Sequence, residues 1–204
     1  MSSVPVPQLT ESQYLAIERK ASFKSQYYRG EMFAMAGASQ IHNTIQASLI
    51  RQLGNRLEGT PCQAVGSDLR VLVSATGLYT YPDAVVMCDP AKFLDGQFDT
   101  LVTPKILFEI LSDSTEKYDR STKMSHYMQI DSLQEYVLVS QTQPRVEVYQ
   151  RSTDGKWSYS DASGLAAAIT LESVGITLPL SDIYLRVEFP ASDDPAPLLQ
   201  SGVQ

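Results

Sequence analysis

Residues 108–127, FEILSDSTEKYDRSTKMSHY, contain the strand and the helix around which we expect the fold to be built. The stretch begins as an apolar strand, but Glu109 interrupts it between Phe108 and Ile110. Side chains alternate between the two faces of a strand, so Glu109 shares its face with Leu107. Burying a lone carboxylate costs several kcal/mol, so Glu109 requires a partner.

A second carboxylate occurs in a similar setting in the stretch YPDAVVMC. Asp83 begins this apolar run and shares its face with Val85 and Met87. Two strands that each carry one acid in an apolar background can converge on one divalent ion. Mg²⁺ prefers such a site, with one or two carboxylates, a backbone carbonyl and retained waters.

The helix expected after the Glu109 strand, over residues 117–129, supplies a cation. Asp119, Lys123 and Tyr127 are spaced four residues apart, which places them on one helix face. If that helix packs over the strand, Lys123 can approach the same ion. A lysine there can orient a nucleophilic water and balance charge in a phosphodiester transition state.

The flanking sequence predicts a mixed sheet with helices packed on it. Apolar residues recur at helical spacing between Ser39, a predicted N-cap, and Gly59. A shorter helix should follow Thr10, with Gln13 at the capping-box position. Short extended runs lie on either side of Arg29–Gly30 and within residues 62–74, 78–89, 104–112, 134–140 and 145–151.

Length and composition favour one globular domain. The chain has 204 residues, 43% apolar and 19% charged. We assign the domain to residues 1–188 and expect a disordered tail over residues 189–204, which are rich in Pro, Ser and Asp. The sequence shows no membrane-spanning run and no export signal, so we expect a cytoplasmic protein. Cys62 and Cys88 are then expected to be reduced thiols.

The net charge weighs against one class of function. Sixteen Lys and Arg oppose 23 Asp and Glu, a formal net charge of −7. Proteins that bind the phosphate backbone without sequence preference usually present a basic surface.

Several short motifs, in their order along the chain, resemble restriction-endonuclease-like proteins of the Uma type, in the PD-(D/E)XK nuclease superfamily. They are Y-P-D-A-V-V around Asp83, F-E-I-L-S-x-S-T around Glu109 and D-R-S-T-K-x-x-x-Y around Lys123. G-E at residues 30–31, H-N at 42–43, S-D-L-R-V around Asp68 and E-Y at 135–136 extend the resemblance to about residues 14–184.

The resemblance implies an α+β (α/β) fold with a restriction-endonuclease-like core, a central mixed β-sheet flanked by helices. It implies a metal held by Asp83 and Glu109, and we add the backbone carbonyl of Ile110 as a third ligand. The superfamily lysine normally lies two residues after the acid, where this chain has Leu111, so Lys123 is the substitute. Asp113, which stands where a proline is common, adds negative charge near the site.

Each of these residues also has a structural interpretation. Asp83 can be a turn acid that follows Pro82. Glu109 can form a salt bridge with Lys123 or Lys105. Lys123 can pair with Asp119 on a solvated helix face.

Five further residues are candidates for a second shell or for substrate contact. Glu31 and Asp68 are expected to point towards the same cleft. His42 is either a helix-capping or packing residue or a substrate contact. Tyr127 is expected to pack the helix, and Asp119 to support Lys123.

The function expected from these residues is a Mg²⁺- or Mn²⁺-dependent endonuclease that hydrolyses DNA by metal-activated water. Asp83, Glu109 and Lys123 would be its catalytic residues, and we expect a homodimer. A catalytically silent nuclease-fold protein with a binding or regulatory role is the alternative, favoured by the acidic balance. A hydrolase of a smaller phosphate ester is a third.

Overall fold

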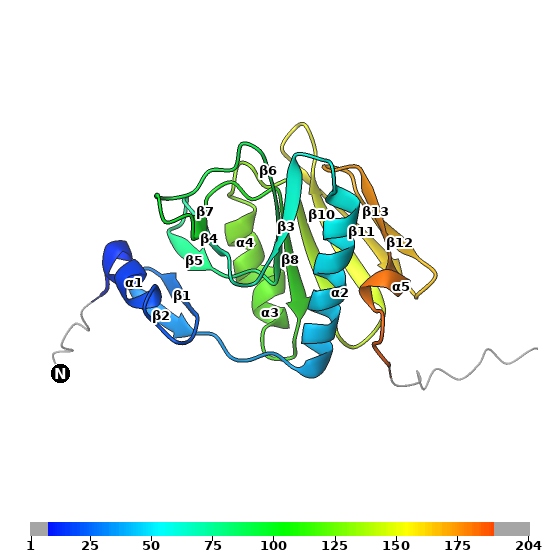
Figure 1. The fold of residues 1–204 in the computed structure, drawn as a ribbon, viewed down its shortest axis with the longest axis horizontal. Coiled ribbons are helices and arrows are strands. Elements are labelled where there is room, and N and C mark those ends of the chain that lie inside the picture. The colour runs from blue at the N-terminus through cyan, green and yellow to red at the C-terminus, as the bar shows by residue number, and fades with distance from the viewer. Residues whose placement is uncertain (1–7, 190–204) are drawn as a thin grey trace, which may run out of the picture.

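A six-stranded mixed sheet forms the centre of the computed structural model, which describes residues 8–189 (Figure 1). Its order is β11 (Trp157–Ser163), β10 (Arg145–Arg151), β9 (Glu135–Ser140), β8 (Ile106–Leu111), β6 (Ala84–Cys88) and β3 (Cys62–Gly66). Strands β8 and β9 are parallel, and the other neighbouring pairs are antiparallel. The expected α+β architecture, with mixed sheets flanked by helices, is confirmed.

A second sheet and a separate hairpin complete the β-structure. The five-stranded sheet has the order β2 (Glu31–Ala34), β1 (Ser25–Tyr28), β5 (Leu78–Thr80), β4 (Arg70–Val73) and β7 (Thr100–Leu101). Strands β12 (Ala168–Leu171) and β13 (Ile176–Pro179) form the hairpin. The predicted extended runs on either side of Arg29–Gly30 are β1 and β2. Both turn residues have positive φ, 48° and 89°, which suits a two-residue hairpin connection.

The three predicted helices are present, one of them with an irregular turn, and the short helix α5 was not predicted. They are α1 (Glu11–Glu18), α2 (Gln40–Leu57), α3 (Glu116–Tyr118), α4 (Met124–Tyr127) and α5 (Leu180–Ile183). Thr10 and Gln13 form the predicted capping box, and the Ser39 side chain caps α2. Between α3 and α4 the chain winds as a π-helical segment, η1 (Asp119–Lys123). The helix predicted over residues 117–129 is therefore α3, η1 and α4 in succession.

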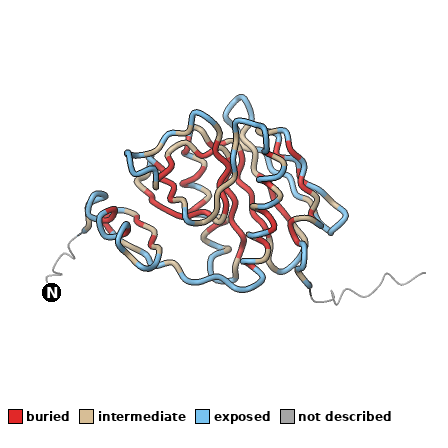
Figure 2. The backbone as a smooth tube through the Cα atoms, viewed as in Figure 1, coloured by how far each residue is buried: buried red, intermediate tan, exposed pale blue. Residues whose placement is uncertain are grey.

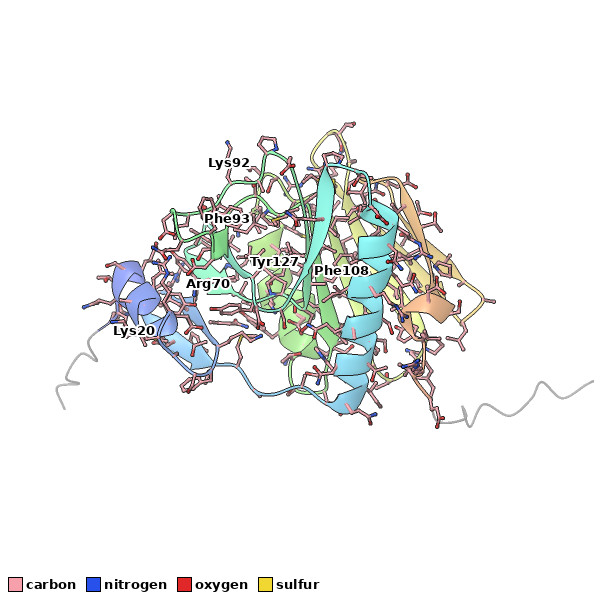
Figure 3. All side chains as sticks on the ribbon, viewed as in Figure 1. Lys20, Arg70, Lys92, Phe93, Phe108 and Tyr127 are labelled. Carbon is pink, nitrogen blue, oxygen red and sulfur yellow. A yellow bond between two sulfur atoms is a disulfide. The ribbon has the colours of Figure 1, made fainter. Side chains whose placement is uncertain are left out.

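The six-stranded sheet has a buried layer on each face (Figure 2). On one face, Phe108 and Ile110 of β8 join the apolar residues of α2. On the other, Leu107 and Leu111 join Tyr127 of α4. Figure 3 labels Phe108 beside α2 and Tyr127 on α4, across the β8 ribbon. The side chains of β8 therefore alternate as predicted, and those on each face of the strand pack against a different helix.

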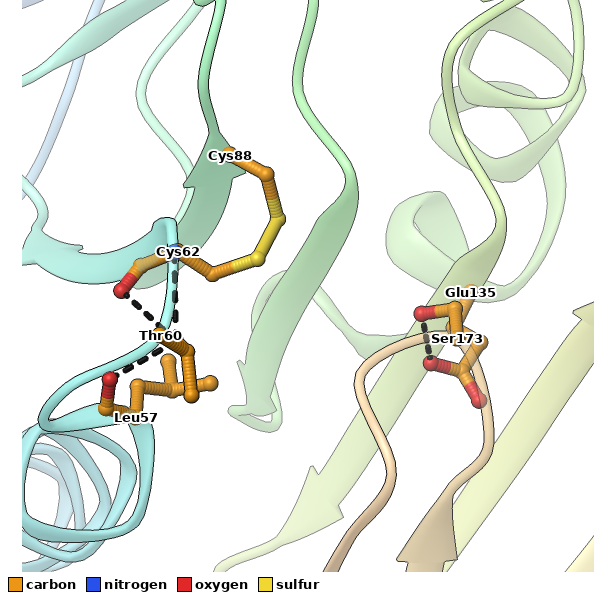
Figure 4. The surroundings of a disulfide bond; sticks show 6 residues. All are labelled: Leu57, Thr60, Cys62, Cys88, Glu135 and Ser173. Atoms are coloured by element: carbon orange, nitrogen blue, oxygen red, sulfur yellow. Dashed lines mark hydrogen bonds between the residues drawn. A yellow bond between two sulfur atoms is a disulfide. The ribbon is translucent and has the colours of Figure 1, made fainter.

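The two cysteines form a disulfide, which corrects the expectation of reduced thiols (Figure 4). Strands β3 and β6 pair antiparallel in a register that places Cys62 directly opposite Cys88, with 3.9 Å between their Cα atoms. Thr60 fixes the approach to β3, because its hydroxyl donates to the Leu57 carbonyl at 2.7 Å and accepts from the Cys62 amide at 3.2 Å.

Two further expectations concern the termini and membranes. Residues 190–204 of the predicted tail lie outside the described residues. Phe189, the first residue of that tail, is described, and its ring centroid lies 5.3 Å from that of Tyr184. Among residues 8–189, every helix is too short or too polar to cross a bilayer.

Candidate functional site

Asp83 and Glu109 lie on neighbouring segments of the six-stranded sheet. Strand β6 pairs antiparallel with β8 so that Ala84 lies opposite Phe108. Asp83 directly precedes β6, and its backbone amide donates to the Phe108 carbonyl at 3.1 Å. Its side-chain Oδ2 accepts the Ile110 amide at 2.7 Å. Asp83 therefore contacts the β8 residues on both sides of Glu109.

Glu109 is buried and contacts two side chains of the helical segment. Its side chain is 5% exposed. The Tyr127 hydroxyl donates to Glu109 Oε1 at 2.8 Å, and Lys123 Nζ lies 2.7 Å from the same oxygen. The four-residue spacing on this helix face therefore brings both groups to one carboxylate oxygen.

Lys123 is equally buried and contacts a second acid. Its ammonium lies 3.3 Å from Asp119 Oδ1, so Lys123 bridges Asp119 and Glu109. Asp119 and Lys123 are the two ends of the π-helical segment. The Tyr136 hydroxyl of β9 donates to the Asp119 carbonyl at 3.0 Å, which fixes this segment to the sheet. Single π-helical turns within α-helices are rare and are frequently found at functional sites.

The pKa values of Glu109 and Lys123 are shifted because two buried carboxylates, Glu109 and Asp119, share the Lys123 ammonium. Burial raises the pKa of Glu109; Lys123 opposes this rise, while Asp119 and Asp83 add to it. Burial alone would lower the pKa of Lys123, but Glu109 and Asp119 hold it above its usual range. Lys123 is therefore a permanent cation near neutral pH. It can orient and stabilise anionic groups, and it is not suited to accept a proton.

Asp83 is held by contacts from β8 and α2. Its Oδ2 accepts the Ile110 amide at 2.7 Å and lies 3.1 Å from His42 Nε2. Gln46, one turn along α2, donates to the Asp83 backbone carbonyl at 2.7 Å. The Nδ1 atom of His42 is buried and has no hydrogen-bond partner among the described residues. His42 can therefore donate Nε2–H to Asp83 while Nδ1 remains free as an acceptor.

Two of the predicted residues do not contact this centre. Glu31 is exposed on β2, where it pairs with Tyr28. The Asp68 side chain is 97% exposed and lies 3.1 Å from Lys24 Nζ. Within residues 8–189, no hydrogen bond or ion pair joins either acid to Asp83 or Glu109.

Gln46 and Tyr136 are the contacts that the sequence argument missed. Gln46 is four residues after His42, so helical spacing alone places both on the same face of α2. Tyr136 belongs to the E-Y motif, but its role depends on the irregular winding at Asp119, for which the sequence gives no local indication.

The carboxylates suit a hard divalent cation. No group of three or more His, Cys, Asp or Glu side chains in the described part of the chain is arranged to hold a metal. Mg²⁺ does not need one, because one or two carboxylates, a carbonyl and waters satisfy it. The contacts on Asp83 fall on Oδ2 and those on Glu109 on Oε1. Each acid therefore has a second oxygen outside these contacts, and the pair fits such an ion.

The family model named Uma2, with the description "Putative restriction endonuclease", matches residues 11–181. The chain belongs to the Uma2 family. It is 35% identical over 187 residues to the uncharacterised protein slr1290 of Synechocystis sp., covering 92% of this chain and 97% of that protein. A second uncharacterised Synechocystis protein, sll1609, is 34% identical over 161 residues, covering 79% and 91%.

A solved structure supports the fold of this Uma2 family member. The crystal structure of an Anabaena variabilis protein, described as a "putative nuclease belonging to DUF820", superposes with a TM-score of 0.71 at 17% identity. The match covers 86% of this chain and 97% of that one. At this identity the likeness establishes the shared fold.

Proposed function

We propose that this Uma2 protein is a divalent-metal-dependent endonuclease that hydrolyses phosphodiester bonds of DNA. The observation that carries the proposal is that Asp83 contacts the strand residues on both sides of Glu109, with the Lys123 ammonium 2.7 Å from Glu109. Membership of a family with the description "Putative restriction endonuclease" supports the same chemistry.

The roles follow from the contacts. Asp83 and Glu109 would hold Mg²⁺ or Mn²⁺, with the Ile110 carbonyl as a further ligand. The ion would supply a water of lowered pKa and offset the charge of the reacting phosphate. Lys123 would position water and phosphate oxygens as a fixed cation. His42 and the Ile110 amide orient Asp83, so both act through that carboxylate.

The direct test is cleavage of supercoiled and linear DNA with Mg²⁺ or Mn²⁺. Asp83→Asn and Glu109→Gln keep the shape of each side chain and remove its charge, so the cleavage rate should fall at least about a hundredfold. Asp131→Asn and Glu58→Gln make the same changes at exposed positions and should leave the rate unchanged. Cleavage at the full rate by Glu109→Ala would refute the assignment.

One observation favours a second candidate, a nuclease-fold protein that binds without cutting. Lys123 neutralises Glu109 directly, so this carboxylate has a cationic partner within the protein and does not require a metal ion. The net charge of −7 also weighs against tight phosphate-backbone binding. Calorimetric titration of Mg²⁺ and Mn²⁺ separates the two. Binding that is abolished in Asp83→Asn supports the enzyme, and the absence of binding by the wild type supports the silent protein.

A further inference from the structure

A groove of about 620 Å³ runs beside α2, outside the carboxylate centre. Its lining includes Asn43, Thr44, Ser48 and Arg51 of α2, with Arg186 from the segment after α5. These five residues define the α2 groove. Thr44, Ser48 and Arg51 are four and three residues apart, so they form one stripe along the helix, and Asn43 lies beside its start.

The two arginines of the α2 groove are exposed and unneutralised. Neither Arg51 nor Arg186 has an ion pair or a side-chain hydrogen bond among residues 8–189, and no acidic residue lines the groove. Arg19, Arg56 and Arg120, in contrast, each contact a carboxylate within 2.8 Å. In a chain with a net charge of −7, the groove is a local site where two guanidinium groups have no acidic partner.

The backbone fixes Arg186 in a conformation that costs free energy. Its φ is 66°, in the left-handed region that non-glycine residues rarely adopt. The Val187 amide donates to the Tyr184 carbonyl at 3.0 Å, and the Tyr184 hydroxyl donates to the Arg145 carbonyl at 2.6 Å. Such strained positions persist where the surrounding structure holds them and are enriched at binding sites.

The α2 groove and the carboxylate centre lie on different faces of α2. His42, which contacts Asp83, and Arg51, which lines the groove, are nine residues apart and therefore about 180° apart around the helix. From His42 to Arg51 the helix rises about 13 Å, at ~1.5 Å per residue. One DNA strand carries a phosphate about every 3.4 Å along the duplex axis, so this length suits a few consecutive phosphates.

We propose that the α2 groove binds the sugar–phosphate backbone of the DNA substrate on the outer face of α2, away from the carboxylate centre. The inference rests on the proposed function, because it assigns further substrate contacts to the proposed nuclease. Arginine guanidinium groups, hydroxyls and side-chain amides are the groups that contact phosphates in protein–DNA interfaces, and such contacts carry no direct sequence information. Binding through the groove is therefore independent of base sequence and sensitive to salt.

The test measures binding without cleavage. The full chain is titrated, in EDTA, into fluorescent 20-base-pair duplexes of two unrelated sequences, and anisotropy is followed at several salt concentrations. The Arg51→Ala/Arg186→Ala variant should bind both duplexes at least about tenfold more weakly than the wild type, with a salt slope smaller by about 2. The matched control, Lys20→Ala/Lys92→Ala, removes two exposed cations that lie away from α2 and should stay within about twofold of the wild type (Figure 3).

Three outcomes overturn the inference. In the first, the groove variant binds like the control; in the second, the wild type binds neither duplex. In the third, light scattering shows that the groove variant has lost a dimer present in the wild type, which makes the groove a contact between copies of the chain. Circular dichroism confirms that each variant is folded. Since no metal is present, a wild type that binds through the groove but never cuts with Mg²⁺ or Mn²⁺ refutes the proposed function alone.

Discussion

Glu109, at the scale of single residues, shows why a carboxylate can stay in the interior of a sheet. Its partners come from one helix face, Lys123 as an ion pair and Tyr127 as a hydrogen-bond donor. The sequence predicts this proximity because strand alternation and four-residue helical spacing are both local rules. The contact between His42 and Asp83 is less predictable, because it requires α2 to lie across the strand end.

Removal of the Lys123 charge should strongly destabilise the fold. In Lys123→Met, Glu109 and Asp119 remain buried without their cation, at a cost of about 3–5 kcal/mol in the free energy of unfolding. Urea unfolding measures the loss, and Mg²⁺ should restore part of it if the ion can replace the ammonium. Lys117→Met, an exposed change on the same helical stretch, is the control. Equal stability of Lys123→Met and the wild type would contradict the buried ion pair.

Metal binding should depend on pH through Glu109. Burial raises the pKa of this carboxyl, although the paired Lys123 opposes the rise, so as pH falls a proton competes with a bound cation sooner than at an exposed glutamate. The affinity for Mg²⁺ should therefore be greatest in mildly alkaline solution and decrease as pH falls. Calorimetry in buffers of different ionisation enthalpy measures this affinity and counts the protons released per ion, and that count should rise as pH falls. An affinity that does not change from mildly alkaline pH down to the ordinary glutamate pKa of about 4.3 would show that Glu109 is not the titrating ligand.

At the scale of elements, the success of the sequence argument depends on how local each feature is. The capped helix α2 and strand β8 are predicted because each carries a regular apolar pattern. Strand β11 has the polar sequence WSYSDAS, is mostly exposed at the sheet edge and lacks any such pattern. The disulfide was also missed, because it depends on the register of β3 against β6 and not on the residues near either cysteine.

Reduction of the disulfide should lower the stability of the protein. The bond between Cys62 and Cys88 closes a loop with a sequence separation of 26, and a bridge of this span contributes about 3 kcal/mol by restricting the unfolded chain. Dithiothreitol should therefore shift the urea midpoint of the wild type to lower concentration. The Cys62→Ser/Cys88→Ser variant should unfold at the same midpoint with or without reductant. An unshifted wild-type midpoint would mean that the bond adds nothing to stability.

For the whole molecule, charged contacts join the N-terminal helix to the second sheet. Arg19, which directly follows α1, contacts Asp95 and Asp99, each at 2.7 Å. Arg70, a buried residue of β4, lies 3.0 Å from Asp99. Asp99 thus receives two guanidinium groups, and its hydrogen bonds with Arg19 make the largest contribution to holding its pKa well below the usual range.

This arrangement predicts acid sensitivity. Because the folded-state pKa of Asp99 is lowered, its contribution is fully present above the ordinary aspartate pKa of about 3.9 and is lost as pH falls further. Asp99→Asn should cost about 1 kcal/mol at pH 7, since the side chain is partly exposed. The difference from the wild type should shrink below pH 4 in unfolding experiments. A difference that stays constant down to pH 2 would show that the charge of Asp99 does not contribute to the free energy of unfolding.

The position of Asp83 beside the Glu109 strand determines where the family can tolerate changes in chain length. Loops that connect β6 to β8 can gain or lose residues without moving either acid. A single-residue deletion within β6, between Asp83 and Cys88, would turn either Asp83 or the anchored cysteine towards the wrong side of the sheet. Homologues that keep the centre should therefore vary in length after Cys88 and be constant between these two positions.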